Sequence, residues 1–405
     1  MSLNISNLKE SNAFLSVLFD NLTSAIFLAD TDYKVKTVNH SFEILFNKRN
    51  EAAIGQLCGD VLGCYYTIAE KSKCGTTSHC NTCELRASIR DTFLSKNDQS
   101  RKQLSREFLI DSIKTLKHLQ YSTRYIKFDN NEMIVLIVDD ITDIINQKNE
   151  LKEKNREIIA SLRYAKKIQS SLLPCEDVLA TTVSESFTIF MPKDIVSGDF
   201  YWVYKTNDYL YCAVADCTGH GVPGAFMSLL GISFLNQILS EMGTVAPSLI
   251  LDRLRILIVD VFKQQGNEIK DGMDVILIAL NTKTLKCQYS GANNSLYFVR
   301  HLSSEFEELL PDKMPIGLYE NMSPFTNKTI QLAKGDILYL RTDGFEDQFG
   351  GPQDKKFLSG HLKDLLLNIC KKTMVEQKEI LLTTFDKWKD DSFQIDDVTL
   401  LGLKV

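Results

Sequence analysis

The chain of 405 residues has little proline, with only 8 residues of this type, and it carries no excess of positive charge. The scarcity of proline and a hydrophobic fraction of 44% exclude a long disordered tract and indicate a folded protein. The net charge is −6, and no basic face with interleaved aromatic residues recurs, so a nucleic-acid partner is not expected. At this length we expect two or three domains.

The sequence shows neither a leader nor a run that could cross a membrane. Its start, MSLNISN, has neither the basic residues nor the apolar core of a signal peptide. Apolar segments such as 227–237 are too short or too polar to span a bilayer. We therefore expect a cytoplasmic protein with no membrane partner, whose ten cysteines are reduced or metal-bound rather than a disulfide framework.

Four short acidic motifs stand out in the C-terminal half. They read VSGDFYW at 196–202, ADCTGHGVPGA at 215–225, LRTDGFE at 340–346 and IDDVTL at 395–400. Each places an aspartate at the end of an apolar or β-prone run, so strand ends that meet on one rim would gather four carboxylates around one cavity. Such carboxylates repel each other and need hard divalent cations such as Mg²⁺ or Mn²⁺. Taken singly, each aspartate is more typical of an ordinary turn.

In this order and approximate spacing, the motifs resemble those of the PPM-type metal-dependent serine/threonine phosphatases. The similarity is greatest to the bacterial branch that includes the sporulation stage II protein E, and it runs from about residue 187 to 405. The resemblance implies a mixed α+β fold, an α-β-β-α sandwich with two central antiparallel sheets. It also implies hydrolysis of phosphoserine or phosphothreonine on a partner protein, with an anti-sigma-factor antagonist as the implied substrate.

The resemblance further implies two Mn²⁺ or Mg²⁺ ions with a water or hydroxide between them. Asp216 would bridge the two metals, and the carbonyl of Cys217 would help to hold one of them. Asp199 would act on one side, which makes Asp216 and Asp199 the predicted catalytic residues. Two cations in this arrangement acidify the shared water and stabilise an in-line phosphoryl displacement, so no protein nucleophile is required.

The remaining candidate residues surround this centre. By the resemblance, Asp343 and Asp396 would ligate the other metal, and Asp274 in the acidic loop 271–274 would contribute to a further metal site. Animal members hold the substrate phosphate with an upstream arginine, but no arginine lies between residues 164 and 200. Lys193 is the nearest cation, unless it is a solvated surface lysine. His220 is either a general acid or a support for its glycine-rich loop, and we favour the second role.

The N-terminal region resembles a PAS domain over about residues 12–142, in which a small antiparallel sheet cups a ligand cavity. Two strands around a tight turn precede a short helix, and two further β-rich runs lead to the segment DDIT. These elements are expected at 24–30, 33–39, 41–46, 119–128 and 133–138, with DDIT at 139–142.

Half of all the cysteine lies within 26 residues of this region, between residues 58 and 83. Cys64, Cys74, Cys80 and Cys83 form a run that ends in a Cys-x-x-Cys pair. Four thiolates at such spacing suit a tetrahedral Zn²⁺ ion or an iron–sulfur cluster. A reversible disulfide between the last two, or no bound metal at all, are the alternatives.

A connector without glycine or proline follows at 143–174, until Pro174 ends the expected helix. Apolar residues recur every seven positions at Ile144, Leu151, Ile158, Ala165 and Leu172, and the intervening core positions of the same seam hold Lys148, Asn155, Leu162 and Gln169. This polar-interrupted heptad predicts a parallel homodimer of modest stability. The alternative is a single solvated spacer helix.

The phosphatase domain is expected at 180–405. Its expected helices lie near 224–241, 247–264 and 357–386, and its expected strands lie at 209–215, 275–280, 285–290, 336–341 and 397–403. The rival functional interpretation is a non-catalytic sensory scaffold that only binds a partner, but all four expected metal carboxylates are present. A histidine kinase is excluded, because the connector has no histidine and no ATP-binding box follows.

Overall fold

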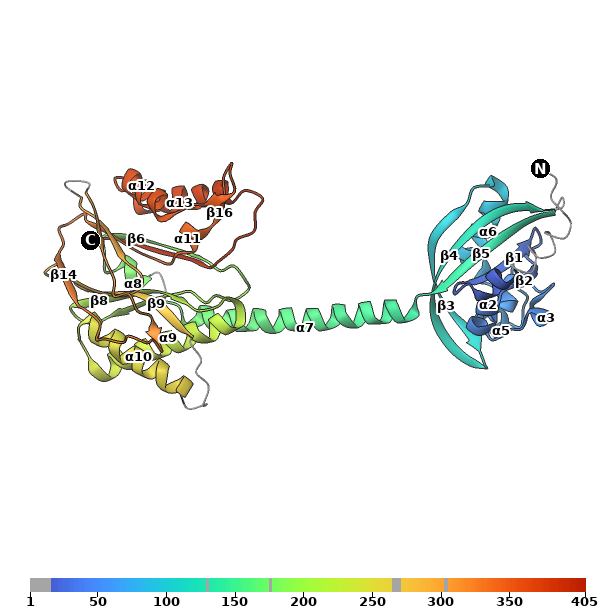
Figure 1. Ribbon diagram of the computed structural model, residues 1–405, viewed down its shortest axis with the longest axis horizontal. Coiled ribbons are helices and arrows are strands. Elements are labelled where there is room, and N and C mark those ends of the chain that lie inside the picture. Colours follow the sequence, from blue (N-terminus) through green and yellow to red (C-terminus); the bar gives the residue numbers. More distant parts are fainter. Residues whose placement is uncertain (1–15, 129–130, 175–176, 264–270, 302–304) are drawn as a thin grey trace. The chain divides into compact units, whose positions relative to one another are not determined.

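The computed structural model describes residues 16–128, 131–174, 177–263, 271–301 and 305–405. The chain divides into two compact units, residues 1–156 and 157–405. The division falls within helix α7 (Thr142–Leu172), drawn in green in Figure 1. Residues 12–15, 129–130, 264–270 and 302–304 of the expected domains lie outside the described residues, and the bounds of the three expected domains stay predictions.

The N-terminal unit is an antiparallel five-stranded sheet with the order β2-β1-β5-β4-β3. Its strands are β1 (Ala25–Asp30), β2 (Val35–Val38), β3 (Gln99–Ile110), β4 (Ile113–Phe128) and β5 (Asn131–Asp140). The sheet curves around the helices between β2 and β3 (Figure 1). These are α2 (His40–Phe46), α3 (Asn50–Ala53), α4 (Cys58–Val61), α5 (Tyr65–Ala69), η1 (Cys80–Thr82) and α6 (Glu84–Ser95).

Buried Asn39 fixes the junction between β2 and α2. Its side-chain oxygen accepts hydrogen bonds from the amides of Phe42 (3.0 Å) and Ile26 (2.8 Å), so it caps the helix and ties it to β1. Both expected strands and the expected helix of this hairpin are present. The long strand β3 was missed, because only Leu104 and Phe108 along it are buried and the rest of the segment is polar.

The C-terminal unit stacks two antiparallel sheets between two pairs of helices, which confirms the expected sandwich (Figure 1). The first sheet has the order β14-β10-β9-β8-β7, with β13 paired to β9. Its strands are β7 (Phe200–Lys205), β8 (Tyr209–Cys217), β9 (Gly272–Asn281), β10 (Lys286–Ala292), β13 (Ile316–Gly317) and β14 (Lys328–Gln331). The second has the order β12-β11-β15-β18-β6. Its strands are β6 (Glu185–Met191), β11 (Leu296–Val299), β12 (Phe306–Leu309), β15 (Ile337–Arg341) and β18 (Val398–Lys404).

Alternation of side chains along β8 shows why the sheets stack. Leu210, Cys212 and Val214 point to one face and pack against the second sheet. Tyr211 and Ala213 point to the other face, under helices α9 (Gly221–Met242) and α10 (Pro247–Lys263). A strand that is buried on both faces reads as a continuous apolar run, which is how this segment reads in the sequence.

Two expectations about helices were wrong. The single helix expected at 357–386 is two, α12 (Ser359–Ile369) and α13 (Met374–Lys389), because Thr373 and Glu376 form a capping box that starts a new helix. The apolar segment at 227–237 belongs to α9, which is long and apolar enough to cross a membrane by length and composition. Its buried face packs against the first sheet, which explains its apolar character within a folded unit.

Short elements complete the unit. They are α8 (Asp177–Ala180), α11 (Gly344–Asp347), β16 (Phe349–Gly350) and β17 (Lys355–Lys356).

Candidate active site

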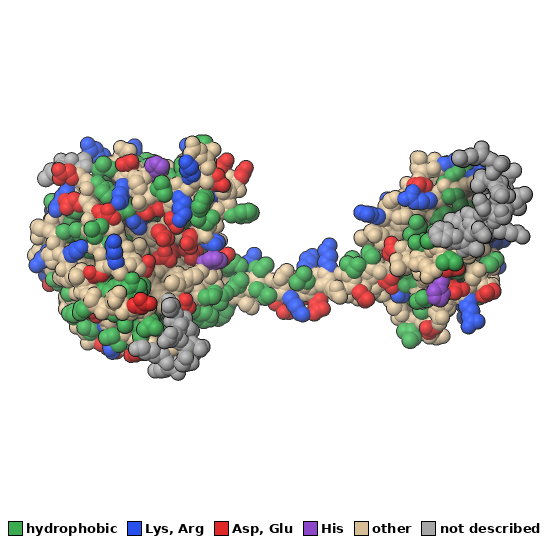
Figure 2. Space-filling model, in the orientation of Figure 1, with side chains coloured by type: hydrophobic (Ala, Val, Ile, Leu, Met, Phe, Trp, Pro, Cys, Tyr) green, Lys and Arg blue, Asp and Glu red, His purple; other side chains and the backbone are tan. Residues whose placement is uncertain are grey.

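The candidate active site lies where strand ends from the two sheets meet at one edge of the sandwich. Asp216 near the end of β8 lies opposite Asp274 near the start of β9, and Asp199 directly precedes β7. In the second sheet, Asp343 follows β15 and Asp396 precedes β18. Antiparallel pairing brings the end of one strand beside the start of the next, so these aspartates converge. Figure 2 shows acidic side chains grouped on this unit.

Asp199 links the two sheets. It is 2% exposed, and its Oδ2 atom accepts hydrogen bonds from the hydroxyls of Thr342 (2.6 Å) and Thr399 (2.8 Å) of the second sheet. Burial raises the pKa of Asp199, and the two hydroxyls oppose that effect. A buried carboxylate held in this way is positioned before any cation binds.

Asp397 is a site residue that the sequence reasoning did not single out. It is 3% exposed, and its carboxylate accepts hydrogen bonds from the amides of Lys193 and Gly198, both at 2.7 Å. It therefore ties the loop before Asp199 to the start of β18. The two adjacent aspartates in the motif IDDVTL were the signal that could have identified Asp397. Backbone amides bind the carboxylate of Asp397, and this leaves the carboxylate of Asp396 for a ligand.

Glycines let three backbone segments meet beside these carboxylates. A side chain at Gly198 would place its first carbon 2.6 Å from the carbonyl oxygen of Gly219 and 3.3 Å from that of Cys217. A side chain at Gly224 would collide with the same Gly219 carbonyl. The predicted ligand carbonyl of Cys217 thus lies against the loop of Asp199, while its thiol is buried in the core.

Asp216 lies in the negative field of three neighbouring aspartates. Burial raises its pKa to about 10, and repulsion from Asp199, Asp343 and Asp396 adds to this shift. Asp396 has its pKa raised for the same two reasons, burial first and then the neighbouring aspartates. Without cations this cluster therefore retains protons that isolated aspartates would have lost.

Asp274 is held by a residue that the sequence reasoning missed. The amide of Asn293 donates a hydrogen bond of 2.8 Å to its carboxylate. Burial raises the pKa of Asp274 to about 6, and the Asn293 bond opposes the rise. Asn293 follows β10 and has a left-handed backbone with φ of 57°, a conformation that asparagine tolerates well.

The carboxylates form a donor set that fits divalent cations. Among the described residues, no three His, Cys, Asp or Glu side chains yet converge tightly enough to hold an ion. The buried, mutually repelling aspartates nevertheless form a concentration of negative charge that only cations or protons can neutralise. Oxygen-only donors of this kind suit Mg²⁺ or Mn²⁺ rather than softer metals.

Two cationic candidates flank the cluster. Lys193 is half-buried, and its positive charge opposes the rise in the pKa of Asp396, so the two residues are close enough to interact electrostatically. His220 directly precedes α9 and is exposed, and its Nδ1 lies 2.9 Å from the carboxylate of Asp194. This contact is the loop-supporting arrangement that we favoured for the histidine.

Gln169 connects the end of α7 to the site loop. It is 3% exposed, its side-chain amide donates to the Ser197 carbonyl (2.6 Å) and to the Ser228 hydroxyl (2.8 Å), and its oxygen accepts from the Ser197 amide (3.1 Å). The expectation that Gln169 lies in a dimer seam was therefore wrong, because its side chain is enclosed by its own phosphatase unit. It positions the backbone two residues before Asp199.

Comparisons with known proteins agree with this geometry. Residues 206–405 match the family described as stage II sporulation protein E, and residues 13–78 match a PAS domain. The SiaA-PP2C domain of Pseudomonas aeruginosa is 30% identical with a TM-score of 0.57, over 62% of this chain and 98% of that one. The chain belongs to this phosphatase family. It is a protein serine/threonine phosphatase with an N-terminal PAS domain.

A curated relative points the same way. The phosphoserine phosphatase RsbU of Bacillus subtilis is 22% identical over 238 residues, which cover 57% of this chain and 67% of that protein. The matched family region begins after Asp199, and the hydrogen bonds of Asp199 to Thr342 and Thr399 join it to the rest of the phosphatase site.

The raised pKa values predict how pH and metal act on stability. Asp216 has a pKa that is raised in the folded state, so its contribution to the stability of the fold is complete below its ordinary pKa of 3.8. This contribution is lost as the pH rises towards its folded-state pKa of about 10. The melting temperature of metal-free protein should therefore fall as pH rises from 6 to about 9. The increase in melting temperature that Mn²⁺ produces should become larger over the same pH range. Thermal unfolding in chelator and in Mn²⁺ measures both, and a metal effect that shrinks with rising pH would contradict the cluster.

Substitution of Gln169 by leucine should weaken the phosphatase unit and its site. The change leaves Ser197 without its buried partners, which costs about 1–3 kcal/mol of stability. We expect a lower melting temperature and a higher Mn²⁺ concentration for half-maximal hydrolysis of p-nitrophenyl phosphate. Gln147→Leu, on the exposed surface of the same helix, is the matched control. If both variants behave as the unaltered chain, Gln169 does not position the loop.

Proposed function

We propose that this phosphatase removes phosphate from phosphoserine or phosphothreonine of a partner protein at the carboxylate cluster, with two Mn²⁺ or Mg²⁺ ions bound. The observation that supports the proposal is the field around Asp216, where three further aspartates raise the pKa of a buried carboxyl. Folding such a cluster together has a large electrostatic cost, which a purely structural role leaves unexplained.

Each residue has a distinct part in this proposal. Asp216 lies between the other carboxylates and would be shared by the two ions, with the Cys217 carbonyl and Asp199 beside it. Asp343, Asp396 and, at a further site, Asp274 would complete the ligands. When bound, the ions supply an acidified water and neutralise the charge on the phosphoryl group during its transfer.

The protein's own groups orient the substrate around these ions. Lys193 interacts electrostatically with Asp396 and is the proposed partner of a substrate phosphate oxygen, in place of the arginine used by animal members. The site is open on the side of Asp343, which is exposed, and this suits a phosphorylated side chain presented by a protein surface. His220 keeps the glycine-rich loop in place through Asp194.

The substrate we propose is a phosphorylated anti-sigma-factor antagonist, and the PAS domain is the proposed regulator. The phosphoserine named in the description of RsbU supports the first part. The competing function, a sensory scaffold without catalysis, has no specific observation in its favour, because none of the expected carboxylates is replaced. Comparison of phosphoserine and phosphotyrosine peptides as substrates tests the residue class directly.

We also propose a parallel homodimer through α7. Ile144, Leu151 and Ile158 recur every seven residues on this helix and are 63%, 61% and 57% exposed. A repeated apolar stripe of this kind is typical of a coiled-coil seam. Because Gln169 is enclosed in the phosphatase unit, the proposed pairing involves the helix before that residue.

Asp216→Asn should abolish hydrolysis, because a neutral amide cannot balance two cations. The measurement is the rate of release of phosphate from a phosphoserine peptide with Mn²⁺, together with Mn²⁺ affinity by calorimetry. Asp208→Asn, which removes the same charge beside the opposite end of β8, is the control and should keep full activity. An active Asp216→Asn protein, or wild-type activity that survives a chelator, would refute the two-metal proposal.

Asn155→Leu should strengthen the proposed dimer by replacing a polar seam residue with an apolar one. Sedimentation of the full chain should show a lower dissociation constant than for the unaltered protein. Asn149→Leu makes the same chemical change off the seam and should leave the constant unchanged. A chain that stays monomeric in all three forms would make the connector a single spacer helix.

A further inference from the structure

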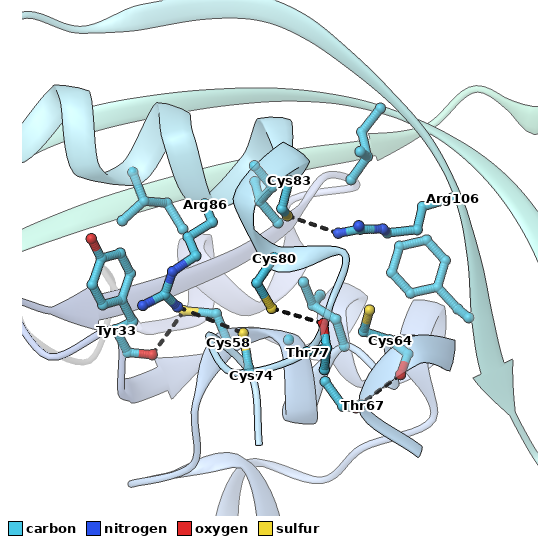
Figure 3. A pocket seen from close by; sticks show the side chains of 16 residues that line it. Tyr33, Cys58, Cys64, Thr67, Cys74, Thr77, Cys80, Cys83, Arg86 and Arg106 are labelled. Carbon is cyan, nitrogen blue, oxygen red and sulfur yellow. Dashed lines mark hydrogen bonds between the residues drawn. The ribbon is translucent and has the colours of Figure 1, made fainter. Parts of the chain in front are cut away.

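The N-terminal unit encloses a cavity of about 40 Å³ whose wall contains all five clustered cysteines. They come from separate places in the chain: Cys58 begins α4, Cys64 directly precedes α5, Cys74 follows α5, Cys80 begins η1 and Cys83 directly precedes α6. Figure 3 shows the sulfur atoms around this cavity, with the guanidinium groups of Arg86 and Arg106 among them. The phosphatase function uses none of these residues, so the cavity is a separate site.

One of the five cysteines differs from the others. The Cys58 thiol donates a hydrogen bond of 3.1 Å to the carbonyl of Tyr33, and the residue is 4% exposed. A sulfur that uses its hydrogen in this way is a protonated thiol, whereas a metal ligand is a thiolate. Cys58 is therefore set apart from Cys64 and from the three cysteines that follow.

Those three sulfurs lie beside hydrogen-bond donors. Cys80 accepts from the Gly75 amide at 3.1 Å and lies 3.0 Å from the Thr77 hydroxyl. Arg106 donates to Cys83 at 2.8 Å, and Arg86 approaches Cys74 at 3.9 Å. Donors and positive charges around sulfur stabilise the thiolate, which is the form that binds metals.

An aromatic ring supports Arg86, and two glycines leave room for Arg86 and Cys74. The guanidinium of Arg86 lies 4.2 Å from the centre of the Tyr33 ring. A side chain at Gly75 would meet that guanidinium at 2.9 Å, and one at Gly59 would lie 2.6 Å from the Cys74 sulfur. Larger residues at these positions would displace either the sulfur or its cation, so the wall is built for this arrangement.

We propose that Cys64, Cys74, Cys80 and Cys83 hold one thiolate-ligated metal centre inside the PAS cavity, either Zn²⁺ or an iron–sulfur cluster. Four thiolates around either centre leave excess negative charge, which Arg86 and Arg106 balance. Among the described residues, the side chains do not yet converge on a single ion position, and the same is true of the carboxylates of the phosphatase. Binding of the metal would have to draw the four thiolates together, so metal binding and folding of this wall would be coupled.

The test is the metal content of the full chain, purified without oxygen and measured by elemental analysis with acid-labile sulfide. We expect either about one zinc per chain or iron with matching sulfide, as four thiolate ligands require. Zinc without sulfide would identify a Zn²⁺ centre, and iron with sulfide would identify an iron–sulfur cluster. Because the carboxylate cluster also binds cations, the content is taken as the difference from a Cys80→Ser, Cys83→Ser double variant.

Cys58→Ser is the matched control, because it lies in the same wall and a serine hydroxyl can still donate to Tyr33. We expect this variant to keep its metal, whereas Cys74→Ser and the double variant lose at least half of theirs. Phosphatase activity and circular dichroism show that each variant has folded. Wild-type protein with neither metal, even after incubation with zinc or with iron and sulfide, would overturn the proposal. Equal loss from Cys58→Ser would overturn this choice of ligands.

Discussion

The packing of two apolar sheet faces is the constraint on which the phosphatase unit depends. Leu210, Val214 and Ile276 of one sheet meet Leu338 and Leu401 of the other in one hydrophobic core. Burial of such surfaces is the dominant favourable contribution to folding. Once the faces are in contact, the strand ends have no freedom to separate, so their aspartates are forced together against their mutual repulsion.

The surrounding structure is arranged to tolerate that repulsion rather than to remove it. Hydroxyl groups of Thr342 and Thr399 hold Asp199, and backbone amides occupy Asp397, so two of the buried carboxylates are already satisfied. The field is thereby concentrated on Asp216 and its neighbours. Repulsion between these carboxylates lowers the stability of the fold, and bound cations restore it. Folding of the site is therefore coupled to metal binding.

Gln169 extends this coupling to the connector. Its side chain completes the hydrogen bonds of the Ser197 backbone, and Ser197 leads directly into the carboxylate loop. A displacement of the end of α7 would therefore alter the loop through a short, buried contact rather than through a long chain of residues. This physical contact gives the helix a means of acting on the site, and it is independent of what the PAS domain detects.

The sequence by itself indicated the fold class through the family resemblance that its four acidic motifs carry, because the order and spacing of short motifs can be read without their partners in space. The capping-box residues Thr373 and Glu376 are also present in the sequence, but the predicted helix ran across them and only the structure showed the break. Only the tertiary structure showed the roles of Asp397, Asn293 and Gln169. Their partners lie 19 to 204 residues away in the chain, and a hydrogen bond over such a separation leaves no periodic trace in the sequence.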